Sequence, residues 1–257
     1  MRRTPRPGIL ALALVAVVVA TALVVGRLGA GAGGPADSAA SARPGTVLLV
    51  PGYGGGTAGL AVLARALEAD GRPTVLVQLP ANGTGDLRDS AQALEVAAER
   101  ALAAGAPSVD VVGYSAGGLI ARVWLQDEDR RDEVRRVITL GSPHRGTDLA
   151  ALGLALAPES CPLGCRQLVP GSELLVELAE DETPDGPEWM SLWTTQDEVV
   201  PPESARLDGA INVPLQELCP GVRVDHGGLP TARVVQAVVL QALAADELAE
   251  PTDDVCG

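Results

Sequence analysis

The sequence contains no phenylalanine and no lysine, and aromatic residues make up only 2% of its 257 positions. A hydrophobic core must therefore consist mainly of Ala, Leu and Val. Positive charge is also scarce, because 19 basic residues, all of them arginine, face 33 acidic ones and give a formal net charge of −14. So negative a surface repels phosphate backbones, which argues against nucleic-acid binding. Intrinsic disorder is excluded as well, because 47% of the residues are apolar and only 20% are charged.

Histidine and cysteine are scarce too, with two and four residues. The cysteines form no C-x-x-C pair, so a zinc cluster is not expected, and their even number suits two disulfide bonds in an oxidising compartment. Of the three possible connectivities we predict Cys161–Cys165 and Cys219–Cys256, because the pentapeptide 161–165 forms a turn whose ends reach disulfide distance. The second bridge closes the longer loop and should stabilise the fold by about 3–4 kcal/mol.

Residues 1–44 differ in composition from the rest. A basic start with three arginines precedes the uncharged, almost wholly apolar run Ile9–Val25, and a Gly/Ala/Ser-rich stretch follows. This is the layout of an export signal. The run of 17 residues also reaches the lower limit of a membrane span. Two outcomes therefore stay open: a cleaved signal with a secreted protein, or an uncleaved anchor with its N-terminus inside the cell.

From residue 45 to 257, which we expect to form one domain, short β-branched runs alternate with longer segments rich in Ala, Leu, Glu and Arg. Apolar runs bounded by Pro or Gly predict buried strands, and apolar residues at helical spacing predict helices. The alternation predicts an α/β fold with a mostly parallel sheet and helices on both faces. Strands are expected at 46–50, 74–79, 108–112, 134–140, 189–194 and 210–214, and helices at 57–70, 87–104, 116–126 and 231–244.

The strongest local motif is Gly113-Tyr114-Ser115-Ala116-Gly117, between the predicted strand 108–112 and the predicted helix 116–126. A G-x-S-x-G sequence in that position is typical of a nucleophile elbow, a tight turn that lifts the serine hydroxyl above the sheet. Taken alone, the motif could be an ordinary Gly/Ser-rich turn. Its place after an apolar strand and before an apolar helix favours Ser115 as a nucleophile.

A nucleophilic serine needs a base, and the only histidines are His144 and His226. In this architecture the order along the chain is serine, then acid, then histidine. His144 follows Ser115 too closely to leave room for a strand that carries the acid. His226 lies late, in a loop before the last predicted helix. We therefore predict His226 as the general base and His144 as a structural residue.

The acid that orients the base should follow a strand between the serine and the histidine. Asp197 does so, just beyond the predicted strand 189–194, where a carboxylate would hold the imidazole and stabilise the imidazolium. Glu198 is the neighbouring alternative. Asp148 and Asp225 are weaker ones, since each suits a turn or a solvated surface.

An oxyanion hole needs two backbone N–H groups near the developing negative charge. One should come from Ala116, directly after the nucleophile. The other should come from the Gly-rich loop Pro51–Gly56, where we favour Tyr53 and keep Gly54 as an alternative. This loop has neither the G-K-[ST] nor the G-x-G-x-x-G pattern, so it does not resemble a phosphate-binding loop.

With these motifs in place, residues 46–245 resemble secreted bacterial lipases and esterases of the α/β-hydrolase superfamily, close to the small class 2 lipases. The resemblance implies Ser115, Asp197 and His226 as the triad, Tyr53 and Ala116 as the oxyanion hole, a monomer, and no metal or cofactor. Pro51 departs from it, because many lipases have His there. The matching segments are V-P-G-Y-G-G-G at 50–56, G-Y-S-A-G-G at 113–118, L-G-S-P-H-R-G-T at 140–147, and, as in lipase B-type enzymes, Q-D-E-V-V-P at 196–201 and D-H-G-G-L-P at 225–230.

Residues 147–188 contain no convincing strand but include the uncharged run Leu149–Pro158 and a helix-like stretch, Ser172–Ala179. Because this segment follows the fourth strand, it should lie over the carboxyl end of the sheet, above Ser115. It either packs down as core or forms a lid or acyl-pocket wall whose apolar face contacts lipid aggregates.

The leading hypothesis is a serine carboxylic-ester hydrolase that acts on lipid or other acyl esters through an acyl-enzyme. An acyltransferase, thioesterase or amidase would use the same residues on the same fold. A non-catalytic surface protein with a hydrolase scaffold is the third possibility. The complete Ser/Asp/His set argues against it, because such a scaffold need keep none of the three.

Overall fold

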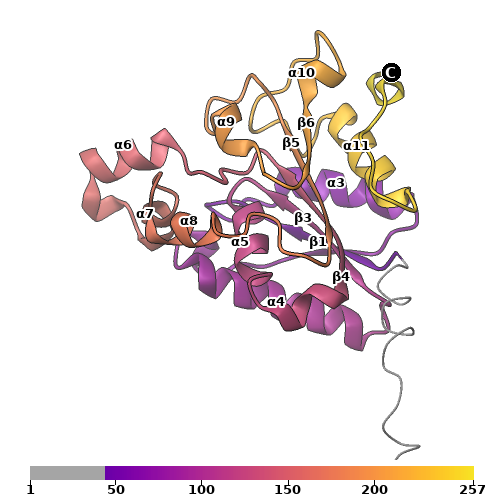
Figure 1. The fold of residues 1–257 in the computed structure, drawn as a ribbon, viewed down its shortest axis with the longest axis horizontal. Coiled ribbons are helices and arrows are strands. Elements are labelled where there is room, and N and C mark those ends of the chain that lie inside the picture. Colours follow the sequence, from indigo (N-terminus) through magenta and orange to yellow (C-terminus); the bar gives the residue numbers. More distant parts are fainter. Residues whose placement is uncertain (1–43) are drawn as a thin grey trace, which may run out of the picture. The chain divides into compact units, whose positions relative to one another are not determined.

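The computed structural model describes residues 44–257, and Figure 1 shows their arrangement. The predicted export segment lies, apart from Pro44, outside the described residues. In the described part of the chain, no helix combines the length and the apolar character needed to cross a membrane.

The sheet has six strands, all parallel, in the order β2-β1-β3-β4-β5-β6. Parallel neighbours need a crossover connection, which the helices between the strands supply. The predicted parallel sheet is therefore confirmed. The strands are β1 (Thr46–Val50), β2 (Thr74–Leu76), β3 (Val109–Tyr114), β4 (Val134–Leu140), β5 (Glu188–Trp193) and β6 (Ile211–Pro214).

Helices cover both faces of this sheet. Side chains alternate along each strand, so Leu48 and Val50 pack into one buried cluster with α4 and α5, while Val47 and Leu49 pack into the other with α3 and α11. Strands buried on both faces explain the continuous apolar runs of the sequence. The helices are α3 (Ala58–Ala69), α4 (Leu87–Ala103), α5 (Ala116–Trp124), α6 (Asp148–Leu156), α7 (Leu163–Gln167), α8 (Glu173–Leu178), α9 (Pro202–Ala205), α10 (Leu215–Leu218) and α11 (Arg233–Ala244).

Strand β2 is shorter than the sequence predicts, because it ends at Leu76 rather than at residue 79. It lies at the sheet edge and pairs only with β1. After Val77 the chain turns into the short 3₁₀ helix Pro80–Gly83, where Ala81 and Asn82 adopt left-handed backbone angles. The apolar pattern continues past the point where the partner strand stops, which is why the pattern alone overextends the strand.

The 147–188 segment contains α6, α7 and α8, which lie together at one side of the view in Figure 1. Only Ala150 of α6 is buried, so this apolar helix does not pack down as core. The disulfide Cys161–Cys165 joins the stretch after α6 to α7, and Cys219–Cys256 joins the end of α10 to the C-terminal tail. Both pairings are the predicted ones.

Candidate active site

The turn between β3 and α5 is held tight by its glycines. A Cβ on Gly113 would lie 2.6 Å from the Gly118 nitrogen, and one on Gly117 would lie 2.2 Å from the Val50 oxygen. No side chain fits at either position. Ser115 itself has φ 54° and ψ −128°, a strained conformation for a residue other than glycine. The backbone is thus forced into an elbow at Ser115.

Three side chains from distant parts of the sequence form one hydrogen-bonded chain. The Oγ of Ser115 lies 3.1 Å from Nε2 of His226, and Nδ1 of His226 lies 2.7 Å from Oδ2 of Asp197. The side chains of Asp197 and His226 are 1% and 8% exposed. An ionised carboxylate only accepts hydrogen bonds, so Nδ1 carries the ring proton and Nε2 is free to accept the serine hydroxyl proton.

Asp197 is fixed by the backbone that follows it. Its Oδ1 accepts hydrogen bonds from the N–H groups of Val199, at 2.9 Å, and Val200, at 2.7 Å. The other candidate acids do different things. Glu198 is exposed, and Oδ1 of Asp225 accepts from the Gly228 N–H at 2.7 Å within the histidine loop. Asp148, also exposed, lies in the first turn of α6.

Gly141, at the end of β4, is a site residue that the sequence prediction missed. It has φ 55°, and a Cβ there would lie 3.2 Å from Oδ2 of Asp197, 3.3 Å from Nδ1 of His226 and 2.5 Å from a Leu229 methyl carbon. The acid–base pair therefore packs directly against a bare backbone. The signal available in the sequence was a glycine directly after a predicted strand.

Tyr114, the residue directly before Ser115 in the G-x-S-x-G motif, is a second site residue that the sequence prediction missed. Its hydroxyl donates to the backbone oxygen of His226 at 3.2 Å, and the two rings lie 5.2 Å apart. Burial, together with the negative charge of Asp197, raises the pKa of Tyr114 to about 12. The hydroxyl therefore stays protonated at neutral pH and keeps supporting the histidine loop.

His144 takes part in a separate buried network. Thr139 donates to Ser191 at 2.9 Å and Ser191 donates to the Ala205 oxygen, so the Thr139 oxygen accepts from Nε2 of His144, which is 3.1 Å away. Nδ1 of His144 is buried without a hydrogen-bond partner. Burial, with the nearby arginine charges, lowers the pKa of His144 well below its usual value. This ring is therefore neutral and has no hydrogen bond to the Ser115–His226 pair.

The predicted oxyanion donors lie where they can face the serine. Ala116 is the first residue of α5, where a helix leaves its N–H groups without partners inside the helix. The loop after β1 comes close on the other side, since a Cβ on Gly52 would lie 2.7 Å from the Ser115 Cβ. Tyr53, the next residue, lines a pocket together with Ser115.

This pocket has a volume of about 170 Å³ and is mostly apolar. Its walls come from the Gly-rich loop Pro51–Gly56 after β1 (the oxyanion loop), the loop after β4, helices α6 and α7, and the loop after β5. Ser115 is one of its lining residues, so an acyl group bound there would lie beside the serine hydroxyl. The lining residues are Tyr53, Ser115, Pro143, Thr147, Leu149, Ala150, Cys165, Leu168, Val199 and Val200.

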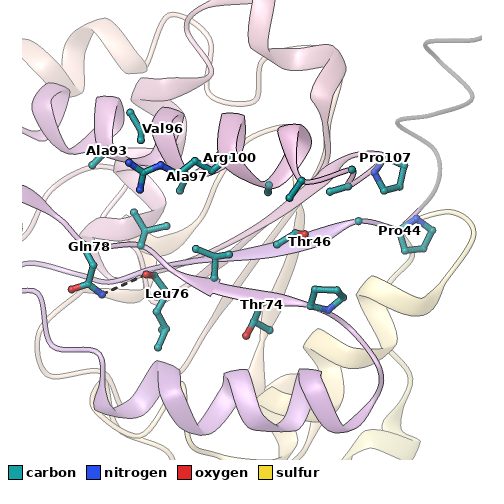
Figure 2. A pocket seen from close by; sticks show the side chains of 18 residues that line it. Pro44, Thr46, Thr74, Leu76, Gln78, Ala93, Val96, Ala97, Arg100 and Pro107 are labelled. Atoms are coloured by element: carbon teal, nitrogen blue, oxygen red, sulfur yellow. Dashed lines mark hydrogen bonds between the residues drawn. The ribbon is translucent and has the colours of Figure 1, made fainter.

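A larger cavity of about 900 Å³ lies elsewhere, between the edge strand β2 and helix α4 (Figure 2). Its polar side chains include Thr74, Gln78 and Arg100, and none of the triad residues reaches it. The chemistry of the lining, not the size, therefore identifies the smaller pocket as the candidate site. Across residues 44–257 no group of three or more His, Cys, Asp or Glu side chains could hold a metal ion.

Comparison with solved structures places this fold among known enzymes. Lipase B of Aspergillus fumigatus superimposes with a TM-score of 0.71 at 22% identity, over 83% of this chain and 57% of that one. The mature lipase BlEst2 of Bacillus licheniformis gives 0.66 at 18% identity, over 79% of this chain and 95% of that one. A metagenomic α/β-hydrolase from lagoon sediments in Morocco, MGS-MChE2, gives 0.53 at 17% identity, over 74% and 86%. The chain has the α/β-hydrolase fold, as the sequence resemblance predicted.

At the level of sequence, a family model described as palmitoyl protein thioesterase matches residues 64–169. The match includes Ser115 and its elbow but ends before Asp197 and His226. No curated protein sequence is significantly similar to this chain. The chain spans 57% of the length of the fungal lipase B. The chain thus shares the α/β-hydrolase fold of these lipases, and part of its sequence is similar to palmitoyl protein thioesterases.

Proposed function

We propose that this protein is a serine carboxylic-ester hydrolase that cleaves acyl esters of lipids. The observation that carries the proposal is the hydrogen-bonded chain from Ser115 through His226 to Asp197, together with the mostly apolar pocket that Ser115 lines. Nucleophile, base and orienting acid are within the distances that acyl transfer requires.

In the proposed mechanism, Nε2 of His226 takes the Ser115 proton while Oγ attacks the ester carbonyl carbon. The N–H groups of Ala116 and Tyr53 stabilise the tetrahedral oxyanion. His226 then gives its proton to the leaving alcohol, and the acyl group remains on Ser115. Water, deprotonated by the same nitrogen, attacks the acyl-enzyme and releases the carboxylic acid, which returns the serine to its starting state.

Lipid esters are favoured over soluble ones by the surface around this pocket. Among residues 44–257, the most exposed large apolar side chains, with the exception of Val96 on α4, belong to the 147–188 segment or to the oxyanion loop. Leu156, near the end of α6, is 76% exposed. Such an apolar surface beside a reactive serine suits contact with lipid aggregates, and it does not depend on charge in an acidic protein. The side chains are Tyr53, Leu149, Leu152, Leu156, Leu163 and Val176.

The test of the proposed activity is a series of nitrophenyl esters and triglyceride emulsions, with Ser115→Ala as the control. We expect hydrolysis by the parent, none above background by the variant, and labelling of the parent by a fluorophosphonate probe. A folded parent that neither hydrolyses the esters nor takes the label would contradict catalysis and favour a binding protein.

The lipid contact is tested by Leu152→Asp, Leu154→Asp and Leu156→Asp on α6. Val96→Asp is the matched control, because Val96 is also exposed, at 41%, but lines the cavity beside β2 (Figure 2). We expect the α6 variants to lose activity on emulsified esters while they keep it on soluble short-chain esters. If Val96→Asp loses as much activity on emulsions as the α6 variants do, the loss is not specific to α6. If the α6 variants lose no activity on emulsions, the enzyme is an esterase for soluble substrates.

A second candidate function is the hydrolysis of S-acyl thioesters, which the match to the palmitoyl protein thioesterase model favours. The same residues would act, but a thiolate leaves more easily than an alkoxide and depends less on a proton from His226. Rates on an S-acyl and an O-acyl substrate with the same acyl chain distinguish the two. A kcat/KM clearly higher for the thioester would favour this candidate.

We further propose that the domain works outside the cytoplasm, since two disulfides are stable in an oxidising compartment and an export signal is predicted at residues 1–44. Cell fractionation, with proteolysis of intact cells, tests this location. Protein found only in the cytoplasmic fraction, with free thiols, would contradict it.

A further inference from the structure

Helix α6, which forms one wall of the pocket, is weakly attached to the rest of the fold. Of its nine residues only Ala150 is buried, and in its C-terminal half Leu152, Ala155 and Leu156 are exposed. At its start, the Thr147 hydroxyl donates to the Val199 oxygen. Packing against the sheet therefore fixes only the first turn of α6.

Helix α7, which also lines the pocket, is attached much more firmly. The Gly164 N–H donates to the Thr84 oxygen at 3.1 Å. The buried side chain of Gln167 accepts from the Leu87 N–H at 2.9 Å and donates to Asp86 at 2.7 Å. These bonds tie α7 to the start of α4, so this wall is a fixed one.

The Cys161–Cys165 disulfide links the stretch after the weakly attached helix α6 to the firmly attached helix α7. Cys161 follows α6 and Cys165 belongs to α7, so the bridge holds the far end of α6 against α7. Besides the bridge, Arg166 donates to the backbone oxygens of Cys161 and Pro158, each at 2.9 Å. Gly153 of α6 packs over the bridge, since a Cβ there would lie 3.9 Å from the Cys165 sulfur.

We propose that the Cys161–Cys165 disulfide sets the width of the acyl pocket and thereby the acyl chain length that the enzyme accepts. The proposal rests on the ester-hydrolase function proposed above. Leu149 and Ala150 line the pocket from α6, and Cys165 of α7 and Leu168, the residue after α7, line it as well, so a movement of α6 relative to α7 changes the width of the pocket.

With the bridge in place, the pocket of about 170 Å³ is small. It lies below the roughly 300 Å³ at which sites for drug-sized ligands begin. A butyryl group is small enough for a pocket of this volume, whereas a palmitoyl chain is longer than the pocket and extends beyond it. Without the bridge, the hydrogen bonds of Arg166 still join the stretch after α6 to α7, but no covalent link does, so α6 can move further from α7 and the pocket can enclose more of a long chain.

The experiment compares two double variants of the full-length protein. Cys161→Ser/Cys165→Ser removes the bridge in the pocket wall, and Cys219→Ser/Cys256→Ser removes the other bridge, which joins α10 to the C-terminal tail. For each we measure kcat/KM on nitrophenyl butyrate, octanoate and palmitate, dispersed below aggregation, and the thermal midpoint by circular dichroism.

We expect the Cys161/Cys165 variant to shift the butyrate-to-palmitate ratio of kcat/KM by about 10-fold or more toward palmitate, in line with the selectivity that a few methylene contacts supply. The thermal midpoint should fall only slightly, because the bridge spans four positions. The control variant should show the reverse, with an unchanged ratio and a lower midpoint, because its bridge spans 37 positions.

A third variant changes the width of the pocket without changing the disulfide. Ala150→Phe adds bulk at a lining position and keeps both cysteines, and it should lower kcat/KM on octanoate far more than on butyrate. An unchanged chain-length ratio in the Cys161/Cys165 variant, while Ala150→Phe does shift it, would overturn the proposal and leave the ester-hydrolase function intact. A parent that hydrolyses none of the three esters would overturn both.

Discussion

Strands β3 and β4 carry polar residues at both ends, and the two ends are built differently. At the amino end, Arg135 donates to both oxygens of Asp110, at 3.0 and 2.7 Å, and to the Leu243 oxygen at 2.9 Å. At the carboxyl end, the same strands lead into the elbow at Ser115 and the turn at Gly141. At the amino end the charges of Asp110 and Arg135 are paired, whereas at the carboxyl end the Ser115 hydroxyl faces a pocket.

Arg136 extends this pattern at the amino end. Its guanidinium bonds to Glu188 at 2.7 Å and to the backbone oxygens of Ala242, Ala245 and Asp246. These carbonyls lie at the end of α11, where a helix has unpaired oxygens and a partial negative charge. The arginine therefore ties the last helix to the middle of the sheet.

The comparison indicates that residues at the amino end of β3 and β4 mainly stabilise the fold, whereas residues at the carboxyl end mainly serve the proposed reaction. At the amino end, removal of one partner leaves a buried charge alone, which destabilises the fold. At the carboxyl end, the Ser115 hydroxyl can change without leaving a buried charge behind. Substitutions at the two ends should therefore affect different measurements, and the predictions below test that separation from the largest effect to the smallest.

The largest effect is expected at the carboxyl end. Ser115→Ala and His226→Ala should each lower kcat by about 10⁴-fold or more, and Asp197→Asn by somewhat less or about the same, since the three act as a unit. The thermal midpoint of Ser115→Ala should stay close to that of the parent. Ester kinetics and circular dichroism measure both quantities. Near-normal turnover by Asp197→Asn would move the acid to Glu198 or another carboxylate.

At the amino end we expect the opposite result. Burial raises the pKa of the Asp110 carboxyl even beside Arg135, so a lone charge there is costly. Arg135→Met should lower the free energy of unfolding by about 3–5 kcal/mol, while kcat per folded molecule stays unchanged. Urea unfolding and active-site titration separate the two effects.

The matched control at this end is the double variant Arg135→Met/Asp110→Val, which removes both charges together. It should recover much of the lost stability, because no uncompensated buried charge remains. If the double variant is as unstable as the single one, packing of the arginine stem and not charge pairing dominates. A loss of kcat in the folded single variant would contradict the separation of the two ends.

Gly141→Ala should have an intermediate effect, because it should lower both kcat and thermal stability. The left-handed backbone costs about 1–2 kcal/mol for a residue with a Cβ. The added methyl group would also push on Asp197 and His226, and a misplacement of about 1 Å can cost about 10²-fold in rate. We therefore expect kcat to fall by about 10²-fold with a modest loss of thermal stability. Unchanged kcat would mean that the Asp197–His226 pair does not depend on this contact.

The sequence was sufficient to predict the parallel sheet and to propose Ser115, Asp197 and His226 as a candidate triad, three side chains that the structure joins by hydrogen bonds. Chain order and positions just after strands are local properties, and they bring residues to the same edge of a parallel sheet. With only two histidines in the chain, few alternatives remained for the base.

The rest depends on register and on tertiary packing, which a sequence pattern does not contain. The register of β3 and β4 shifts between Val109 and Asp110, so Asp110 lies opposite Arg136 in the sheet while its carboxylate accepts from Arg135, and no local signal announces that arrangement. The exposure of α6 was undecided for another reason. A helix that is apolar on nearly all sides shows no preferred face, so the pattern could not distinguish core from surface.

The smallest effect is expected at His144, which follows β4 at the carboxyl end but has no hydrogen bond to Ser115, Asp197 or His226. Burial keeps its folded-state pKa well below the usual value, whereas in the unfolded chain it takes up a proton below about pH 6.5. The unfolded state then binds more protons, so stability falls as pH drops below about 6.5, by up to about 1.4 kcal/mol per pH unit until the folded pKa is reached. His144→Gln removes this titration and should flatten the loss of stability between about pH 7 and pH 5, although it weakens the bond to Thr139 by about 1 kcal/mol at neutral pH. Urea unfolding of both proteins across this range gives a difference curve in which the shared carboxylates cancel. A difference that does not change with pH would show that His144 titrates alike in the folded and unfolded chains, and would contradict its burial as a neutral ring.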